Sequence, residues 1–317
     1  MVRPLICLVF WLITTSSEAF GISFHAYHGQ EEIRASLLQL ARQNPNLVHF
    51  HTLGYSEQGR NIDYVVVSHG EPESLPAIYI NGTHHGDEKA STEGVLGLID
   101  YLVKSRQLPV VRELLSNYAI YLQPLVNPDG HAANRRFDAR GLDPNRDYAY
   151  PGRRDQDSFK TPAIRLVRDL TNKVRFRAAL ALHSGMEGVL WAWAHSAERP
   201  ADFDVFFTLA KLTAQAMGMS QYRQSYSDYP ALGEFIDYAY MTHGTLAMTV
   251  EVANNPTPPA EDLDAVVKRA VAGSVSFMLG IMDLARGELS IIRNSSTRKD
   301  LIPWARTNER ATRQGLQ

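Results

Sequence analysis

The chain has 317 residues, of which 44% are hydrophobic and 21% are charged, and its formal net charge is -2. This composition is typical of a globular protein with enough apolar residues for one large core, and it argues against an intrinsically disordered chain. A net charge this small gives no broad attraction to nucleic acid or to an anionic membrane, so we expect neither as a partner.

The first twenty residues, "MVRPLICLVFWLITTSSEAF", combine basic Arg3, an apolar run over 5–13 and the small residues Ser17 and Ala19. This pattern predicts a signal peptide over residues 1–19 and export to the periplasm or the medium. The run is short for a membrane-spanning helix, and an uncleaved anchor or a buried N-terminal strand is the alternative. The single cysteine, Cys7, lies in this run, so we expect an exported chain without disulfides.

The rest of the chain alternates between two hydrophobic periods. Apolar residues recur with the helical period over 31–43, whereas 62–68 and 77–82 have the apolar runs of buried strands. Further helices are expected near 91–103, 160–172, 201–217 and 261–285, and further strands at 119–126, 178–184 and 245–252. Strands that alternate with helices predict one layered α/β domain over residues 20–285, with 286–317 as a solvated tail.

Polar side chains follow directly on four of the apolar runs. These are "NGTHHGDE" after residue 80, "NPDG" after residue 126, His183, and Glu251. Ligands of open α/β sheets usually bind beyond the carboxyl ends of the strands. We therefore expect the four groups to converge on one edge of the sheet.

The stretch "THHGDE" holds two overlapping pairs, His84 with Asp87 and His85 with Glu88. Each places an imidazole three residues before a carboxylate, a spacing that suits a metal, although a solvated loop is the plain alternative. His183 at another strand end would supply a third ligand, and catalytic zinc typically takes three protein ligands and keeps one open position. The residues alone do not decide which pair would bind.

The next segment, 126–152, is rich in arginine and in turn-forming residues. It predicts a long ordered loop rather than a helix, and its plain alternative is a solvated surface with ion pairs. Within it, "NPDG" is followed by an arginine cluster and then by "DPNRD".

Taken in order, a His-x-x-Glu, an "NPDG", an "NR" pair, a "HS" and a late strand-end glutamate resemble the zinc carboxypeptidases of the carboxypeptidase A type. The resemblance runs from about residue 26 to residue 285 and includes the turn "LGYSEQGRNI" at 53–62. It implies a three-layer α/β/α fold with a central mixed, mainly parallel twisted sheet, and one Zn²⁺ per chain.

The resemblance also implies catalytic roles. His85, Glu88 and His183 correspond to the zinc ligands, and Glu251 corresponds to the general base toward the attacking water. Arg136, in preference to its neighbour Arg135, corresponds to the arginine that stabilises the developing oxyanion. Asp143 corresponds to the carboxylate that orients the first histidine from behind.

Other positions correspond to substrate contacts. Asn145 and Arg146 match the pair that grips the terminal carboxylate, and Tyr229 matches the mobile tyrosine, with Tyr226 as a second candidate. Ile236 matches the base of the specificity pocket and favours apolar C-terminal residues. Glu234, expected on the pocket wall, would instead favour a basic one.

These features predict a secreted zinc metallocarboxypeptidase that hydrolyses the C-terminal peptide bond of peptides or proteins, without a long pro-segment. The chain has Gly-Asp between the first two ligands, where the digestive enzymes have Ala-Arg or Ser-Arg. "HGDE" is similar to bacterial relatives that act on murein peptides, so a γ-D-glutamyl-diaminopimelate peptidase is the first alternative. A non-catalytic zinc-binding module is the second.

Overall fold

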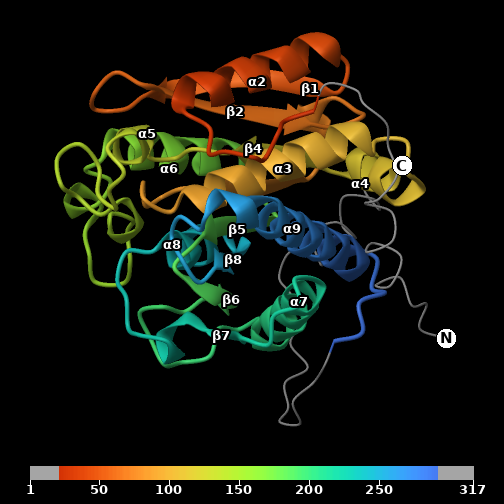
Figure 1. Cartoon of the computed structure of the whole chain (residues 1–317). Coiled ribbons are helices and arrows are strands. Elements are labelled where there is room, and N and C mark those ends of the chain that lie inside the picture. The colour runs from red at the N-terminus through yellow and green to blue at the C-terminus, as the bar shows by residue number, and fades with distance from the viewer. Residues whose placement is uncertain (1–20, 292–317) are drawn as a thin grey trace, which may run out of the picture.

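The computed structural model describes residues 21–291. The predicted signal peptide, Cys7 and the chain beyond residue 291 lie outside the described residues. The core is an eight-stranded sheet with the order β1-β2-β4-β3-β5-β8-β6-β7 (Figure 1). Its strands are β1 (Val48–Tyr55), β2 (Asn61–Val67), β3 (Ala77–Gly82), β4 (Ala119–Gln123), β5 (Ala178–His183), β6 (Met186–Trp191), β7 (Tyr222–Gln224) and β8 (Leu246–Ala253).

Helices cover both faces of this sheet (Figure 1). They are α2 (Gln30–Gln43), α3 (Lys89–Lys104), α4 (Pro109–Asn117), α5 (Pro128–Ala132), α6 (Pro162–Val174), α7 (Phe203–Ala216), α8 (Phe235–His243) and α9 (Leu263–Ala285). Short 3-10 turns are η2 (Pro72–Ser74), η3 (Pro144–Arg146), η4 (Asp155–Asp157), η5 (Ser225–Ser227) and η6 (Ala260–Asp262).

The centre of the sheet is parallel. Strand β3 pairs in parallel with β4 and β5, and β5 pairs in parallel with β8. Strand β2 joins β4, and β6 joins β8, in antiparallel orientation. The predicted mixed, mainly parallel sheet is thereby confirmed.

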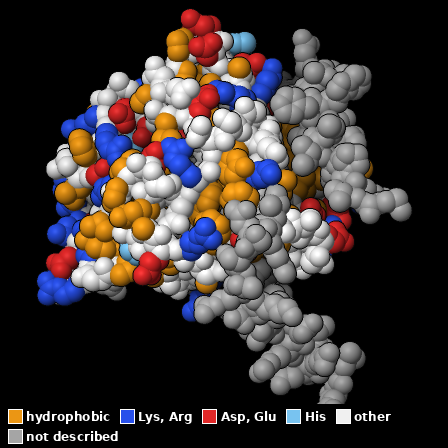
Figure 2. Space-filling model, turned by 90° about the horizontal axis from the view of Figure 1, so that it is seen from below, with side chains coloured by type: hydrophobic (Ala, Val, Ile, Leu, Met, Phe, Trp, Pro, Cys, Tyr) orange, Lys and Arg blue, Asp and Glu red, His pale blue; other side chains and the backbone are white. Residues whose placement is uncertain are grey.

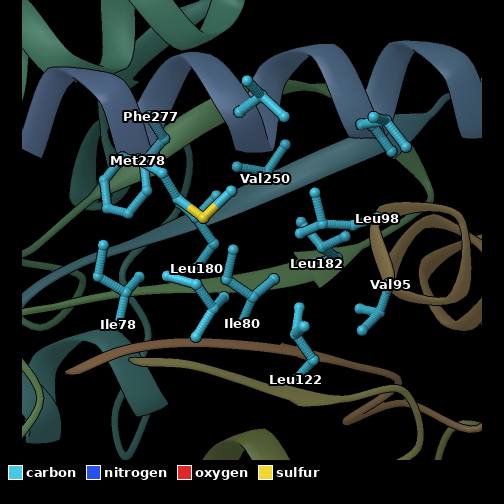
Figure 3. Close-up of a cluster of buried hydrophobic side chains, with 14 of the residues drawn as sticks. Ile78, Ile80, Val95, Leu98, Leu122, Leu180, Leu182, Val250, Phe277 and Met278 are labelled. Atoms are coloured by element: carbon cyan, nitrogen blue, oxygen red, sulfur yellow. The ribbon is translucent and has the colours of Figure 1, made fainter. Parts of the chain in front are cut away.

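Successive residues of the central strands enter two separate cores, because side chains alternate across a strand. Ile78 and Ile80 face a cluster that includes side chains of α2, α3, α4, α7 and α9. Tyr79, between them, faces a second cluster built with α6 and α8. Figure 3 shows the first cluster, where Phe277 and Met278 of α9 lie over the strand residues. The two cores make three layers.

Two expectations need correction, and further elements were not predicted. Segment 126–152 is not a loop throughout, because Asn127 caps the short helix α5 by accepting a hydrogen bond from the Gly130 N–H at 2.9 Å. The strand expected to reach residue 126 ends at Gln123, before Pro124. Strands β1, β6 and β7 and helices α4 and α8 were not predicted at all.

Within the described residues, Ala260–Ala285 is long and apolar enough to cross a membrane, but 72% of its most apolar window is buried inside the fold. A helix that is buried to this extent inside the protein is part of its hydrophobic core. The face of the molecule in Figure 2 carries Lys and Arg interspersed with Asp and Glu rather than a field of one sign.

Candidate metal centre and active site

Three neighbouring parallel strands bring their carboxyl ends to one edge of the sheet. Strand β3 leads into the loop with His85 and Glu88, and β5 ends at His183. Glu251 lies near the end of β8, where it is the register partner of His183 across the β5–β8 pair. The strand-end pattern in the sequence therefore corresponds to residues that are close in space.

His85, Glu88 and His183 are buried together, and their ligand atoms lie within 4.8 Å of one another. His85 Nδ1 lies 2.6 Å from Glu88 Oε1, and His183 Nδ1 lies 2.8 Å from Glu88 Oε2. The Ser184 N–H also donates to Glu88 Oε2 at 3.2 Å. Two imidazole nitrogens that converge on one carboxylate form a nitrogen and oxygen donor set that fits zinc without any thiolate.

The neighbouring pair, His84 and Asp87, lies elsewhere. The His84 ring is fully buried, and its Nε2 lies 2.8 Å from the Tyr148 hydroxyl. The ring also stacks on the His183 ring, with 5.5 Å between the two ring centroids. The Asp87 carbonyl accepts a hydrogen bond from the Thr257 hydroxyl at 2.7 Å. Of the two pairs in "THHGDE", the second faces His183 with its ligand atoms, and His84 supports His183 from behind.

Asp143 supports the first histidine from the opposite side. Its Oδ1 lies 3.1 Å from His85 Nε2 and also accepts from the Asn145 N–H at 2.9 Å. Its Oδ2 accepts from Arg136 Nε at 2.9 Å. A carboxylate in this position fixes the ring and leaves Nδ1 directed toward Glu88.

The electrostatic environment keeps the carboxylates of this group ionised. Burial by itself would raise the pKa of Glu88, but His85 and His183 outweigh it and lower that pKa far below its usual range. Burial opposes the charged form of His85, yet Glu88 and Asp143 raise the pKa of His85 to about 9. A bound cation would therefore compete with a proton on His85.

Glu251 is the carboxylate with the opposite tendency. Burial, reinforced by Glu88, raises the pKa of Glu251 well above its usual range, while His85 opposes the shift. Its Oε2 is buried and has no hydrogen-bond partner among the described residues. A carboxylate oxygen without a partner beside a metal-type cluster is chemically suited to accept a proton.

Of the two adjacent arginines, Arg136 approaches the cluster. Its Nη1 lies 3.8 Å from Glu88 Oε1, and its side chain remains 35% exposed, so a ligand can reach it. Arg135 is exposed and donates from Nη2 to the Asp138 carbonyl at 2.6 Å. Of the two arginines, Arg136 is the one whose side chain lies beside the ligand cluster.

The residues expected to hold the substrate lie around η3 and the segment before α8. Arg146 Nη2 donates to the Tyr229 hydroxyl at 2.9 Å, and Tyr229 is 52% exposed. Asn145 Oδ1 accepts from the Phe235 N–H at 2.9 Å. Tyr226 lies in η5, and its backbone N–H donates to the Trp193 carbonyl.

Ile236 and Glu234 lie on either side of Phe235. The Ile236 side chain is 1% exposed and belongs to the core cluster that α6 and α8 form, so it presents little surface to a ligand. Glu234 Oε1 lies 3.2 Å from Arg146 Nη1. The sequence carried no signal for this ion pair, because its two residues lie on segments that only the fold brings together.

The sequence reasoning noticed Gly86 but missed the close contact that it makes. A Cβ on Gly86 would lie 2.0 Å from the carbonyl carbon of Gly130 and 2.3 Å from the His131 nitrogen. The loop that carries His85 therefore lies backbone to backbone against α5. The Gly86 N–H also donates to the carbonyl of Arg136, beyond the end of α5, at 3.2 Å.

A family model described as zinc carboxypeptidase matches residues 33–273. Carboxypeptidase SOL1 of Arabidopsis thaliana is 23% identical over 260 residues, which cover 76% of this chain and 53% of that protein, about half its length. Carboxypeptidase M of Mus musculus is 25% identical over 328 residues, which cover 89% of this chain and 74% of that protein. The solved carboxypeptidase A from Helicoverpa armigera is similar in fold, with a TM-score of 0.76 at 21% identity over 86% of this chain and 78% of that one.

Proposed function

The chain belongs to the zinc carboxypeptidase family, and we propose that it hydrolyses the C-terminal peptide bond of peptides or proteins. As a zinc metallopeptidase it requires a metal site, and His85, Glu88 and His183 are the residues that would hold the ion. The observation that carries the proposal is the convergence of these three ligand groups beside Glu251, at adjacent strand ends.

The chemistry that a bound zinc supplies is Lewis acidity toward the scissile carbonyl and the attacking water. In the proposed reaction, Glu251 accepts a proton from that water and later donates it to the leaving amine. Burial is the first cause that raises the pKa of Glu251, and a carboxylate whose pKa is raised holds a transferred proton more readily than an ordinary one. Arg136 stabilises the charge that develops on the carbonyl oxygen.

In the same proposal, Arg146 and Asn145 bind the terminal carboxylate of the substrate. A guanidinium can hold a carboxylate through two parallel hydrogen bonds, which explains how an exopeptidase can require a free C-terminus. Tyr229 is half-exposed and touches Arg146, so it can close over the bound residue by a side-chain movement. Ile236 would contribute at most the apolar base of the pocket.

A scan of synthetic peptides that differ in their C-terminal residue tests the proposal, run with and without a chelator. We expect release of single C-terminal residues, lost on zinc removal and restored by added zinc. Glu251→Gln should lower kcat by about 10²–10⁴-fold, the usual contribution of a positioned general acid or base. Glu261→Gln, an exposed change in η6, is the matched control. Full activity of Glu251→Gln would refute the assigned mechanism.

Export is also part of the proposal. The N-terminal pattern supports cleavage after Ala19, so the mature protein should begin at Phe20. Intact-mass measurement of the protein recovered from the periplasm or medium tests this directly, and a full-length mass in the cytoplasm would contradict it.

A further inference from the structure

The first turn of α8 contains a carboxylate that takes no part in the proposed reaction. Asp237 is fully buried, and its Oδ1 accepts a hydrogen bond from the Ala194 N–H at 2.8 Å. Its Oδ2 accepts from the His195 N–H at 3.0 Å and lies 2.6 Å from Nδ1 of the same histidine. Both oxygens of Asp237 therefore bind one short segment, which follows the end of β6 at Trp191.

The same segment holds the loop that carries Tyr229. This tyrosine loop, residues 225–234, connects β7 with α8 (Figure 1). The Tyr226 N–H donates to the Trp193 carbonyl at 3.0 Å, and the Ala231 N–H donates to the Ala194 carbonyl at 3.0 Å. Tyr229 lies between these two attachments, so the backbone at 193–194 fixes the base from which its side chain extends.

The attachments of the tyrosine loop are shielded from water. Ala194 and Ala231 are buried, and Gln224, directly before the loop, donates from Nε2 to the Ser196 carbonyl at 2.8 Å. A buried hydrogen bond is costly to break, because its donor and acceptor find no water to replace the lost partner. A displacement of residues 193–195 would therefore carry the tyrosine loop with it.

The imidazole of His195 holds this segment in place. Its contact with Asp237 is the shortest of the three, and its ring packs edge-on against the Trp193 ring, with 5.0 Å between the ring centroids. Asp237 lies in the first turn of α8, the end of a helix that favours a negative charge, so it is a stable anchor. Without the imidazole, the two backbone hydrogen bonds alone would join residues 194 and 195 to Asp237.

The position of Tyr229 depends strongly on its backbone. The residue is 52% exposed, its hydroxyl accepts from Arg146 Nη2 at 2.9 Å, and the Arg146 guanidinium lies over its ring, 5.7 Å from the centroid. A side chain with half of its surface in solvent is placed less by packing than a buried one. A misplacement of about 1 Å in an active site can cost about 100-fold in rate, so small shifts of this loop matter.

We propose that His195 is a positioning residue for Tyr229. Its contact with Asp237 fixes residues 193–195, these residues hold the tyrosine loop on both sides of Tyr229, and the loop sets where the phenol meets the bound substrate. This inference rests on the proposed function and adds to it a residue that lies outside the proposed substrate contacts.

The test is a double-mutant cycle in the zinc-loaded protein, measured with whichever of benzoyl-glycyl-phenylalanine and benzoyl-glycyl-lysine the wild type cleaves faster. We expect His195→Ala to lower kcat/KM by about tenfold or more, mainly through a higher KM, because a displaced Tyr229 closes poorly on the bound residue. In the Tyr229→Ala background the same change should alter kcat/KM by less than about twofold, since no side chain is left to position. His195→Asn, whose amide nitrogen can take the place of Nδ1, should keep most of the activity.

His28→Ala is the matched control. His28 Nδ1 lies 2.7 Å from the buried Glu93, and 16% of its side chain is exposed, against 17% for His195. The control should lower stability in urea unfolding as His195→Ala does, but leave kcat/KM within about twofold of wild type. His195→Gln, whose amide lies at the position of Nε2 rather than Nδ1, replaces His195→Ala if that variant does not fold.

Fluorine NMR of protein labelled with 3-fluorotyrosine follows Tyr229 without turnover, and the signal that is missing in Tyr229→Ala assigns it. This signal should move or broaden in His195→Ala, return in His195→Asn and stay unchanged in His28→Ala. A role of His195 in stability alone would not move it.

The outcomes separate the inference from the proposed function. A loss of kcat/KM of the same size with and without the Tyr229 side chain, or no loss at all, would overturn the inference, and so would an unchanged fluorine signal in His195→Ala. A wild type that cleaves either peptide leaves the proposed function standing in these cases. If the wild type cleaves neither peptide, the proposed function fails, and the fluorine signal decides the inference alone: a shift restored by His195→Asn supports it, and an unchanged signal overturns it.

Discussion

Gly86→Ala is expected to damage the metal centre although it removes no ligand. The new Cβ would lie 2.0 Å from the Gly130 carbonyl carbon and 2.3 Å from the His131 nitrogen, whereas ordinary contacts begin at 3.4 Å. Both neighbours are backbone atoms, so no side-chain rotation relieves the overlap. The loop or α5 must move by about 1.4 Å, or the two must share that movement.

Helix α5 has little freedom to retreat. The Gly130 N–H donates to Asn127 Oδ1 at 2.9 Å, and a Cβ on Gly130 would lie 2.6 Å from the Phe137 carbonyl oxygen, so this segment is itself closely surrounded. The displacement therefore falls mainly on the loop that carries His85. Because metal–ligand distances tolerate only about 0.2 Å, we expect a 10–100-fold loss of zinc affinity and a loss of about 1–3 kcal/mol in the free energy of unfolding.

Zinc affinity is measured by competition with a chromophoric chelator, and stability by urea unfolding of the zinc-free protein. Gly70→Ala is the matched control, because its Cβ would meet Leu75 at an ordinary 3.5 Å on an exposed turn. It should change stability by less than about 0.5 kcal/mol. Zinc affinity of Gly86→Ala within twofold of wild type, with unchanged stability, would refute the reasoning.

Two other changes test the site and the fold. His85→Ala should weaken zinc binding by more than about 100-fold. His84→Ala should largely keep zinc but lose about 2–4 kcal/mol of stability, because it empties a buried position and leaves the Tyr148 hydroxyl without its partner. Competition titrations measure the zinc affinity and urea unfolding the stability, and the reverse pattern would reject His85 as the ligand. The hydrogen bond from Glu93, 2.7 Å from the His28 ring, raises the pKa of His28 against the effect of burial. The stabilisation from this pair is therefore complete below the pKa that His28 has in the unfolded chain, and it is lost as the pH rises through the pKa of His28 in the folded protein. His28→Gln should therefore cost more stability at pH 5.5 than at pH 9, and equal losses at both pH values in urea unfolding would contradict this.

The elements that the sequence predicted correctly are those with an uninterrupted apolar signal. Strands β3, β5 and β8 are buried along most of their length, and α9 keeps a helical apolar stripe over Leu263–Ala285. Strand β1, "VHFHTLGY", is half-exposed at the sheet edge, and β7 has three residues, so neither has a clear period. In α8 the six residues from Phe235 to Tyr240 are all buried, which removes the polar face by which a helix is detected.

Some residues of the candidate site could be predicted from the sequence around them, whereas others depend on contacts between distant segments. His183 and Glu251 were predictable because each follows its own apolar run, and the register of two adjacent strands brings them together. The pair of Arg146 and Glu234 depends on how the segment before α8 lies against η3, and no local pattern encodes that contact. The sequence proposed Glu234 for the pocket wall but not the cation beside it, because only the folded chain brings Arg146 within 3.2 Å of its carboxylate.

Gly86 shows why some site residues remain ambiguous even when their motif is noticed. In sequence, a glycine beside a metal-ligand histidine indicates either a left-handed backbone or a close approach by another segment. Gly86 is absent from the described residues with positive φ, so an alanine could adopt its backbone conformation. The restriction comes from Gly130, the last residue of "NPDG", and from His131 directly after it, more than forty positions later in the chain. Enlarging the space opposite Gly86 should therefore be the only way to accept a side chain there, since a change in local backbone propensity would leave the overlap in place.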